Sequence, residues 1–258
     1  YSGSFSSEDL RWYYNLAKNH GKSIMVNIDW LKNNRSNTRG EWSFTEGKTR
    51  KKFVHDVKSL VKRYDIDYLT LGVEVNYYAL ISPEGYSFFI KTYNNIKQQL
   101  KESNQKLKIG LSFQLELLYG LHKNWEQKKT LSTLNAIVEN IDYLGVSTYP
   151  ELYYKKKDVQ FSTLDYLDRL KATYEIPIGI LETGINSNNF CANMRVKYVE
   201  KVFQKFRELN LNFLIWCSMI DTSKEVDLWE HCMGLIEYDG KHKKEFNIWK
   251  KKNKRYLK

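Results

Sequence analysis

Two glutamates end matching apolar runs in this sequence, and a carboxyl group can act as an acid, a base or a nucleophile. Glu74 closes the run Tyr-Leu-Thr-Leu-Gly-Val-Glu, and Glu182 closes the run Ile-Pro-Ile-Gly-Ile-Leu-Glu. Burial disfavours the charged form of a carboxyl group, so folding alone gains little from an acid at either position. Two such groups facing one glycosidic bond can cleave it, one as proton donor and one as nucleophile. The pair therefore predicts glycosidase chemistry.

A plainer interpretation of each glutamate is a structural one. Either side chain could cap a neighbouring helix or pair with a lysine, as isolated acids on a protein surface often do. Two acids at matched positions, three apolar runs apart, fit a shared chemical role better than two separate caps.

The elements that must position these glutamates are short apolar runs rich in β-branched and aromatic residues, separated by segments with helical periodicity. Regular alternation of strands and helices predicts a parallel sheet, and 258 residues favour a (β/α)8 TIM barrel in one domain, residues 1–258. A closed barrel of this kind has eight strands, and six are visible here. The count predicts either that the first two βα units are missing from this chain or that the fold is open. The expected strands are Ser23–Asp29, Tyr68–Glu74, Leu107–Gln114, Asp142–Thr148, Ile178–Glu182 and Phe213–Met219.

The helices are also marked in the sequence. Ser7–His20 has helical periodicity and no strand pattern. Ser82-Pro83-Glu84 combines an N-cap residue, a first-turn proline and a first-turn acid, which predicts a helix starting at this point. The residues expected to point inward from that helix are Phe89, Tyr93, Ile96 and Leu100.

Three further segments carry a resemblance to a known family. They are Asp142-Tyr-Leu-Gly-Val-Ser-Thr-Tyr-Pro150, Phe213-Leu-Ile-Trp216 and Gly234-Leu-Ile-Glu-Tyr-Asp-Gly240. With the two glutamates, their order resembles the retaining (β/α)8-barrel glycoside hydrolases of clan A, nearest to endo-β-1,4-galactanase-like members and related uncharacterised proteins. The resemblance covers roughly residues 10 to 250. In that family the acid/base glutamate ends strand four and the nucleophile ends strand seven. The resemblance implies that Glu74 is the acid/base and Glu182 the nucleophile.

The resemblance also implies residues that bind the substrate. Tyr149 matches a tyrosine beside the nucleophile, and Trp216 matches a tryptophan that forms the floor of the subsite at the cleavage point. Tyr149 could instead be a core residue, and Trp216 could simply plug the barrel. Polar and aromatic residues at the ends of other strands would line the same face, because catalytic groups gather at the C-terminal ends of barrel strands. These candidate ligands are Asn27, Asp29, Trp30, Gln114, Glu116 and, just beyond Glu74, Asn76.

The sequence departs from the family pattern at two points. Val73 stands directly before Glu74, where the family usually has an asparagine that holds the 2-hydroxyl of the sugar. An arginine that the family draws from its second strand has no counterpart here. The departures leave an alternative open, in which the protein is a catalytically impaired barrel that binds carbohydrate or serves as a scaffold.

Composition restricts the other classes of function. The formal net charge is +11, but the lysines are scattered and no nucleic-acid-binding motif gathers them, so a solvated basic surface is expected in place of a nucleic-acid partner. No phosphate-binding loop, nucleophile elbow or metal-ligand spacing occurs, which predicts no cofactor and no metal. No transmembrane segment is expected. The resemblance and the first residue, Tyr1, favour a secreted or cell-surface location, and a second chain could cover open sheet edges.

Overall fold

The computed structural model describes residues 7–32, 38, 42–125, 128–153, 161–221 and 232–254. The described residues form six parallel strands whose order, β1 to β6, follows the sequence. All six predicted strands are confirmed, each at or within its expected run apart from a one-residue extension of the fifth. Their bounds are β1 Met25–Asn27, β2 Tyr68–Thr70, β3 Lys108–Gln114, β4 Leu144–Thr148, β5 Ile178–Thr183 and β6 Leu214–Trp216.

Helices separate the strands, so the fold is of the α/β class and its sequential parallel order is that of a (β/α)8 barrel. Their bounds are α1 Ser7–Asn19, α2 Gly47–Arg63, α3 Val75–Ile81, α4 Pro83–Ser103, α5 Leu115–Leu118, α6 Leu131–Asn135, α7 Tyr166–Thr173, α8 Ala192–Glu208 and α9 Lys244–Asn253, with short 3-10 turns η1 Val138–Asn140, η2 Pro150–Leu152 and η4 Ser162–Asp165.

The chain packs as two compact units. Unit 1 comprises Tyr1–Phe113 with Ser132–Leu144, and unit 2 comprises Gln114–Leu131 with Gly145–Lys258. Each unit therefore holds part of the strand order with its own helices. The assignment of residues 1–258 to a single domain stays a prediction.

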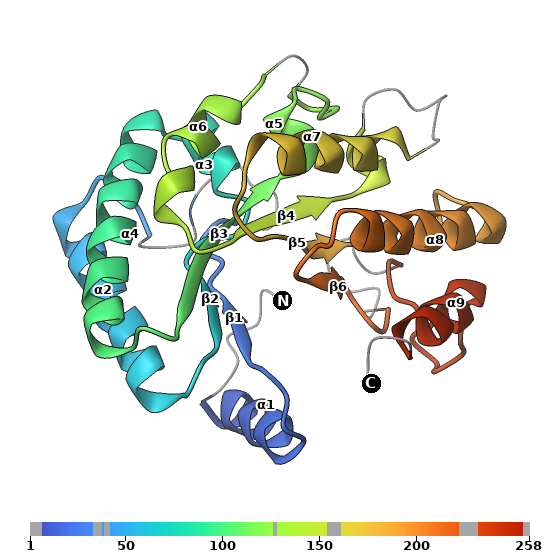
Figure 1. Cartoon of the computed structure of the whole chain (residues 1–258), viewed down its shortest axis with the longest axis horizontal. Helices are drawn as coiled ribbons and strands as arrows, with labels where there is room; N and C mark the ends of the chain where they lie inside the picture. Colours follow the sequence, from blue (N-terminus) through green and yellow to red (C-terminus); the bar gives the residue numbers. More distant parts are fainter. Residues whose placement is uncertain are drawn as a thin grey trace. The chain divides into compact units, whose positions relative to one another are not determined.

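In unit 1, β1 pairs with β2 and β2 with β3, both in parallel, with Tyr68 opposite Met25 on one side and Lys108 on the other. Helices α2 and α4 lie side by side along these strands (Figure 1). The helix start predicted at Ser82 is confirmed, because the Ser82 hydroxyl accepts a hydrogen bond from the backbone N–H of Gly85. All four side chains expected to point inward from α4 are buried.

Asp142 connects α4 to β3 in unit 1 through two ion pairs and a hydrogen bond. Its carboxylate lies 2.8 Å from Nζ of Lys97 and 2.7 Å from Nζ of Lys101, and it accepts a hydrogen bond from the backbone N–H of Ile109. Burial raises the pKa of Asp142, but the two lysines and the Ile109 N–H outweigh it and hold that pKa below its usual value. The carboxylate is therefore ionised in the folded protein over a wide pH range.

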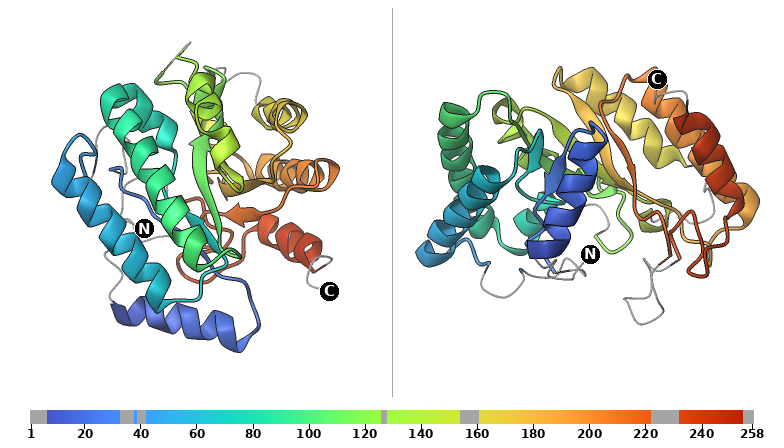
Figure 2. Two further views of the ribbon diagram at one scale, coloured as in Figure 1. Left: turned by 60° about the vertical axis from the view of Figure 1, so that its left-hand side comes forward. Right: turned by 90° about the horizontal axis from the view of Figure 1, so that it is seen from below.

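In unit 2, β5 pairs with β6 in parallel and α8 packs beside α9 (Figures 1 and 2). The strands β4 and β5 are buried along nearly their whole length, as expected for parallel strands covered on both faces. On α8 the apolar side chains of Val199, Val202 and Phe203 are buried. Three candidate functional residues of unit 2, Tyr149, Glu182 and Trp216, lie at or next to the ends of β4, β5 and β6.

Candidate active site

Glu74 lies in unit 1, four residues beyond the end of β2, at the N-terminus of α3. Its backbone adopts the left-handed conformation, with φ 50° and ψ 44°, and its side chain is 4% exposed. A non-glycine residue in this region carries strain of roughly 1–2 kcal/mol, because Cβ approaches the following carbonyl oxygen. Gly72 makes the turn possible, since a Cβ atom there would lie 2.4 Å from Val75 and 3.2 Å from the indole nitrogen of Trp30.

The residues that flank Glu74 are also buried. Val73, which stands where the family has asparagine, is 3% exposed. Asn76 lies in the first turn of α3 and is fully buried, not in a loop beyond the strand. Because α3 begins at Val75, the side chain of Asn76 belongs to a helix that packs in unit 1. Its role as a substrate ligand stays a prediction.

The polar residues that end β1 make local contacts in unit 1. The Asn27 side-chain oxygen accepts a hydrogen bond from the Thr70 hydroxyl at 2.5 Å. One carboxylate oxygen of Asp29 accepts a hydrogen bond from the backbone N–H of Leu31 at 3.1 Å, which is a turn typical of aspartate. Asn27 is exposed and Asp29 is partly exposed, so both side chains keep surface that a ligand could contact.

Trp30, a candidate ligand in the sequence, lies in the core of unit 1, and its role as a ligand stays a prediction. The side chain is 2% exposed and its indole N–H donates to the carbonyl of Leu71 at 3.1 Å. Phe44, Tyr78 and Phe89 surround the indole with ring centroids 4.8–4.9 Å away. An aromatic cluster of this kind buries the faces on which a sugar would stack. Trp30 is a core residue of unit 1.

Glu182 lies in unit 2 and is the next-to-last residue of β5. It is partly exposed, and the residues on either side of it are buried. The Tyr149 hydroxyl donates a hydrogen bond to Oε2 of Glu182 at 3.2 Å. This contact confirms the expectation that Tyr149 stands beside Glu182. The distance is long for an O–H···O hydrogen bond.

Trp216 at the end of β6 is 6% exposed. Its indole N–H donates to the carbonyl of Met233 at 2.9 Å, and its ring packs against Tyr198 and Trp249 at centroid distances of 6.1 and 5.4 Å. Trp216 was expected either to stack on a sugar or to plug the barrel. The packing contacts cover nearly all of the Trp216 side chain, so stacking on a sugar would have to use the small part that stays exposed.

Gln114 is expected to contact substrate, which stays a prediction, and the structure shows its contacts within the protein. The side chain is fully buried and caps α5, since its oxygen accepts a hydrogen bond from the backbone N–H of Leu117 at 2.6 Å. Its amide nitrogen donates to Oε2 of Glu116. Both polar ends of Gln114 are therefore used inside the protein.

Glu116 emerges as a fully buried carboxyl group. Its Oε1 accepts hydrogen bonds from the Thr148 hydroxyl at 2.6 Å and from the backbone N–H of Tyr149 at 3.2 Å. Burial raises the pKa of Glu116 to about 7, although these hydrogen bonds act in the opposite direction. The acid in the apolar run Phe-Gln-Leu-Glu-Leu-Leu was its sequence signal.

Sequence reasoning missed a second such acid, Glu151, in η2. Its Oε1 accepts a hydrogen bond from the backbone N–H of Asn186, and its Oε2 is buried with no hydrogen-bond partner among the described residues. Burial raises the pKa of Glu151 to about 7. Glu116 and Glu151, the two glutamates whose pKa burial raises to about 7, thus precede and follow Tyr149 in the sequence.

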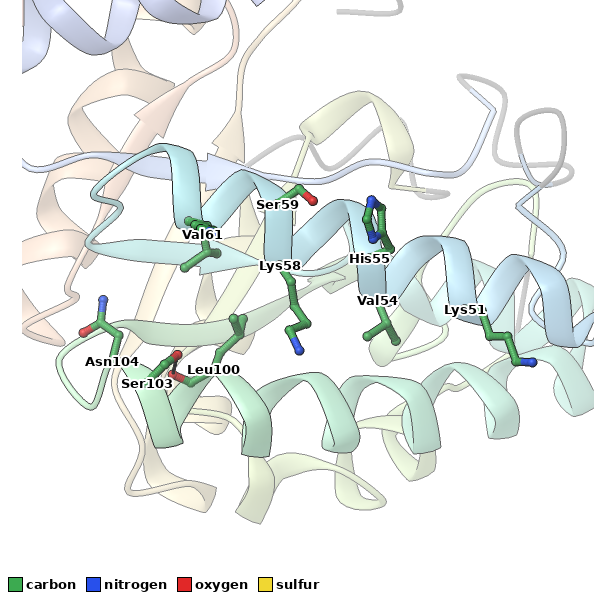
Figure 3. Close-up of a pocket in the computed structure, with 10 residues that line it drawn as sticks. Lys51, Val54, His55, Lys58, Ser59, Val61, Leu100, Ser103 and Asn104 are labelled. Carbon is green, nitrogen blue, oxygen red and sulfur yellow. Dashed lines mark hydrogen bonds between the residues drawn. The ribbon is translucent and has the colours of Figure 1, made fainter.

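A groove of about 650 Å³ lies elsewhere in unit 1, between α2 and α4 (Figure 3). Lys58 extends from α2 toward α4, and Leu100 and Ser103 line the other side. Asn104, also in the lining, precedes β3, so the groove lies near the N-terminal ends of strands. Glu74 follows the C-terminal end of β2, so this groove is not the predicted site.

Other kinds of site receive no support from the described part of the chain. Within it, no three His, Cys, Asp or Glu side chains gather closely enough to hold a metal ion. Over the same residues, no helix is both long and apolar enough to cross a membrane.

Comparison with known proteins gives the fold. No family model matches the chain, and no curated protein matches its sequence. An FMN-binding β-glucuronidase from Facaelibacterium prausnitzii L2-6 has a TM-score of 0.65 at 15% identity, with 97% of this chain and 37% of that chain covered. An exo-β-1,4-mannosidase from Opitutaceae bacterium strain TAV5 has a TM-score of 0.68 at 13% identity, with 100% and 51% covered. The catalytic core of a xylanase A has a TM-score of 0.67 at 12% identity, with 96% and 83% covered.

These neighbours are glycoside hydrolases, and the chain spans about a third to a half of the length of the first two. At such low identity the likeness establishes a glycosidase-like α/β barrel fold. A fold of this kind hosts many activities, so the activity has to be argued from side chains.

Proposed function

We propose that this protein is a retaining β-glycosidase in which Glu74 is the acid/base and Glu182 the nucleophile. The observation that carries the proposal is the hydrogen bond from the Tyr149 hydroxyl to Oε2 of Glu182. A hydroxyl donor stabilises the ionised carboxylate, which is the form that attacks.

The strained backbone of Glu74 supports the second role. Left-handed conformations of non-glycine residues cluster at functional sites, because the surrounding fold must enforce them. The glutamate at position 74 has φ 50° and a nearly buried side chain. Glycine would relieve the strain, so the side chain is expected to serve a purpose other than folding.

The reaction would proceed by double displacement. The Glu182 carboxylate attacks the anomeric carbon, the glycosidic C–O bond breaks, and protonated Glu74 gives its proton to the leaving oxygen. Water then attacks the anomeric carbon of the glycosyl–enzyme ester, the bond from that carbon to Glu182 breaks to release the carboxylate, and Glu74 accepts the proton of that water. A retaining mechanism needs the two carboxyl groups about 5–5.5 Å apart. No cofactor takes part in these steps.

Release of reducing sugar from a panel of β-glycans tests the proposal. The panel includes β-1,4-galactan, β-1,4-mannan and β-1,4-xylan, since the resemblance and the structural neighbours point to different sugars. Glu182→Gln and Glu74→Gln are each expected to abolish release, while Glu208→Gln, an exposed glutamate on α8, keeps the wild-type rate. Azide should restore cleavage to Glu182→Gly by replacing the nucleophile. Undiminished release by Glu182→Gln would exclude the proposed role.

Val73 favours a second candidate function, a barrel that binds carbohydrate without cleaving it. Valine cannot hold a sugar hydroxyl, and it occupies a buried position directly before Glu74. Titration calorimetry with intact oligosaccharides separates the two functions. Binding that is lost in the Glu182→Gln and Asn27→Ala variants, with no cleavage by the wild type over days, would favour the binding protein.

A further inference from the structure

The fully buried carboxyl group of Glu116 takes no part in the proposed reaction, yet both of its oxygens accept hydrogen bonds from neighbouring groups. Each group that contacts it is a donor: the Thr148 hydroxyl, the backbone N–H of Tyr149 and the amide of Gln114. Gln114 is itself fixed by the backbone N–H of Leu117. Burying a carboxyl group is costly unless such donors compensate, so the arrangement needs a reason.

The peptide unit between Thr148 and Tyr149 is held at both of its polar ends. Its carbonyl oxygen, on Thr148, accepts hydrogen bonds from the Thr183 hydroxyl at 2.9 Å and the Tyr198 hydroxyl at 3.3 Å. Its N–H, on Tyr149, donates to Glu116 at 3.2 Å. Side chains from three different segments therefore fix the orientation of this one peptide.

The orientation of that peptide decides where the Tyr149 side chain points. Tyr149 is 4% exposed, and its hydroxyl reaches Oε2 of Glu182. The contact is long, so a small rotation of the peptide would break it. Glu116 acts on the backbone of the residue whose hydroxyl supports Glu182.

We propose that Glu116 is a positioning residue, which orients the Thr148–Tyr149 peptide so that the Tyr149 hydroxyl supports Glu182. This inference rests on the proposed function for its catalytic consequence, but its structural part does not. Glu116 is fully buried with both carboxylate oxygens occupied by donors, so it does not reach a substrate. Its effect is exerted through Tyr149.

The structural part is tested by NMR on protein labelled with 13C at Cζ of tyrosine. The Tyr149 signal is assigned by its loss in Tyr149→Phe, and Glu182→Gln gives the shift that marks a broken contact. Glu116→Gln is expected to move the Tyr149 signal toward the position seen in Glu182→Gln. Glu245→Gln, which replaces an equally buried glutamate paired with Arg195, should leave it unmoved. A Tyr149 signal unchanged by Glu116→Gln would overturn the proposal, whether or not the protein cleaves sugars.

The catalytic part is tested by a double-mutant cycle. Tyr149→Phe and Glu116→Gln are each expected to lower kcat about tenfold with little change in KM, as for loss of a hydrogen bond to a charged group. The double variant should be no slower than Tyr149→Phe alone, because Glu116 acts through Tyr149. A merely structural effect of Glu116 would multiply the two losses, to about a hundredfold, and would contradict the proposal. Absence of cleavage by the wild type would defeat the proposed function and leave the NMR result standing.

A milder variant covers the case in which Glu116→Gln does not fold. Thr148→Val keeps the shape of the side chain and removes one donor to Glu116. It should move the Tyr149 signal in the same direction by a smaller amount. No movement in Thr148→Val would count against the positioning role.

Discussion

The Tyr149 hydroxyl lies 3.2 Å from Oε2 of Glu182 and donates a hydrogen bond to it. Tyr149 directly follows β4, and Glu182 is the next-to-last residue of β5, so the contact joins the ends of two strands in unit 2. Carboxyl ends of parallel strands are where barrel enzymes place reacting groups. The contact links a potential nucleophile to a donor that can hold it ionised.

Removing this donor should weaken the reaction without unfolding the protein. Tyr149→Phe is expected to lower kcat/KM about tenfold, since a hydrogen bond to a charged group contributes about 1.5 kcal/mol or more. Steady-state kinetics on the preferred glycan measures the change. Tyr238→Phe, in which the replaced tyrosine is 72% exposed, is the matched control and should be indistinguishable from wild type. Equal kinetics for both variants would show that the contact does not serve catalysis.

The backbone strain at Glu74 predicts that replacing this residue by glycine raises the stability of the protein and removes its activity. Glu74→Gly relieves the left-handed backbone and should raise the free energy of unfolding by about 1 kcal/mol while abolishing cleavage. Urea unfolding gives the stability. Asn210→Gly is the control, because Asn210 has φ 48° and is exposed, so this variant should keep full activity. A Glu74→Gly protein less stable than wild type would mean that the side chain contributes more to folding than its backbone costs.

Glu151 predicts a dependence of stability on pH. Burial raises its folded-state pKa from the ordinary 4.5 to about 7, so between these values the folded state binds more protons than the unfolded state. Stability therefore falls as pH rises through this window, by at most on the order of 3 kcal/mol, because Glu151 is largely but not fully buried. Glu151→Gln should flatten that part of the curve.

Urea unfolding of wild type and Glu151→Gln at pH 5, 6, 7 and 8 measures this effect. Glu116, whose pKa burial also raises to about 7, remains in both proteins, so the difference isolates Glu151. Glu208→Gln should retain the wild-type curve. Parallel curves for wild type and Glu151→Gln would rule out a contribution from this group.

The aromatic cluster of unit 1 predicts where a tryptophan matters for folding. Trp30→Ala should lower the free energy of unfolding by about 3–5 kcal/mol, as for other buried aromatic truncations. Trp12, which is 60% exposed on α1, should tolerate alanine within about 0.5 kcal/mol. Both values come from urea titrations followed by circular dichroism. A small loss for Trp30→Ala would contradict the core role and favour the predicted role as a ligand.

Local patterns predicted the elements well because they are local in origin. The β-branched and aromatic runs at the six strands and the Ser82-Pro83 helix start express preferences of neighbouring residues for one backbone conformation. The Tyr149–Glu182 contact was also foreseen, since both residues end strands and the resemblance placed a tyrosine beside the nucleophile. For these features the order of residue types along the chain was sufficient.

The same patterns did not reveal what surrounds Trp30 and Gln114. A strand-end position says that a side chain lies near one edge of the sheet, but it does not say which neighbours fill the space around it. Phe44 and Phe89 enclose Trp30 from segments far along the chain, and Leu117 and Glu116 occupy both ends of Gln114. Polarity and aromatic character alone do not distinguish a ligand from a buried partner.

By itself the sequence determined the alternation of parallel strands and helices, and it singled out the two glutamates that follow apolar runs, because periodicity and residue type act over a few neighbouring residues. Only the tertiary structure decided that Glu74 adopts a strained backbone and that Glu116 is buried among donors. It also decided that the peptide preceding Tyr149 is held from both sides. Burial and hydrogen bonding depend on which distant segments meet, and that information is absent from any short stretch of residues.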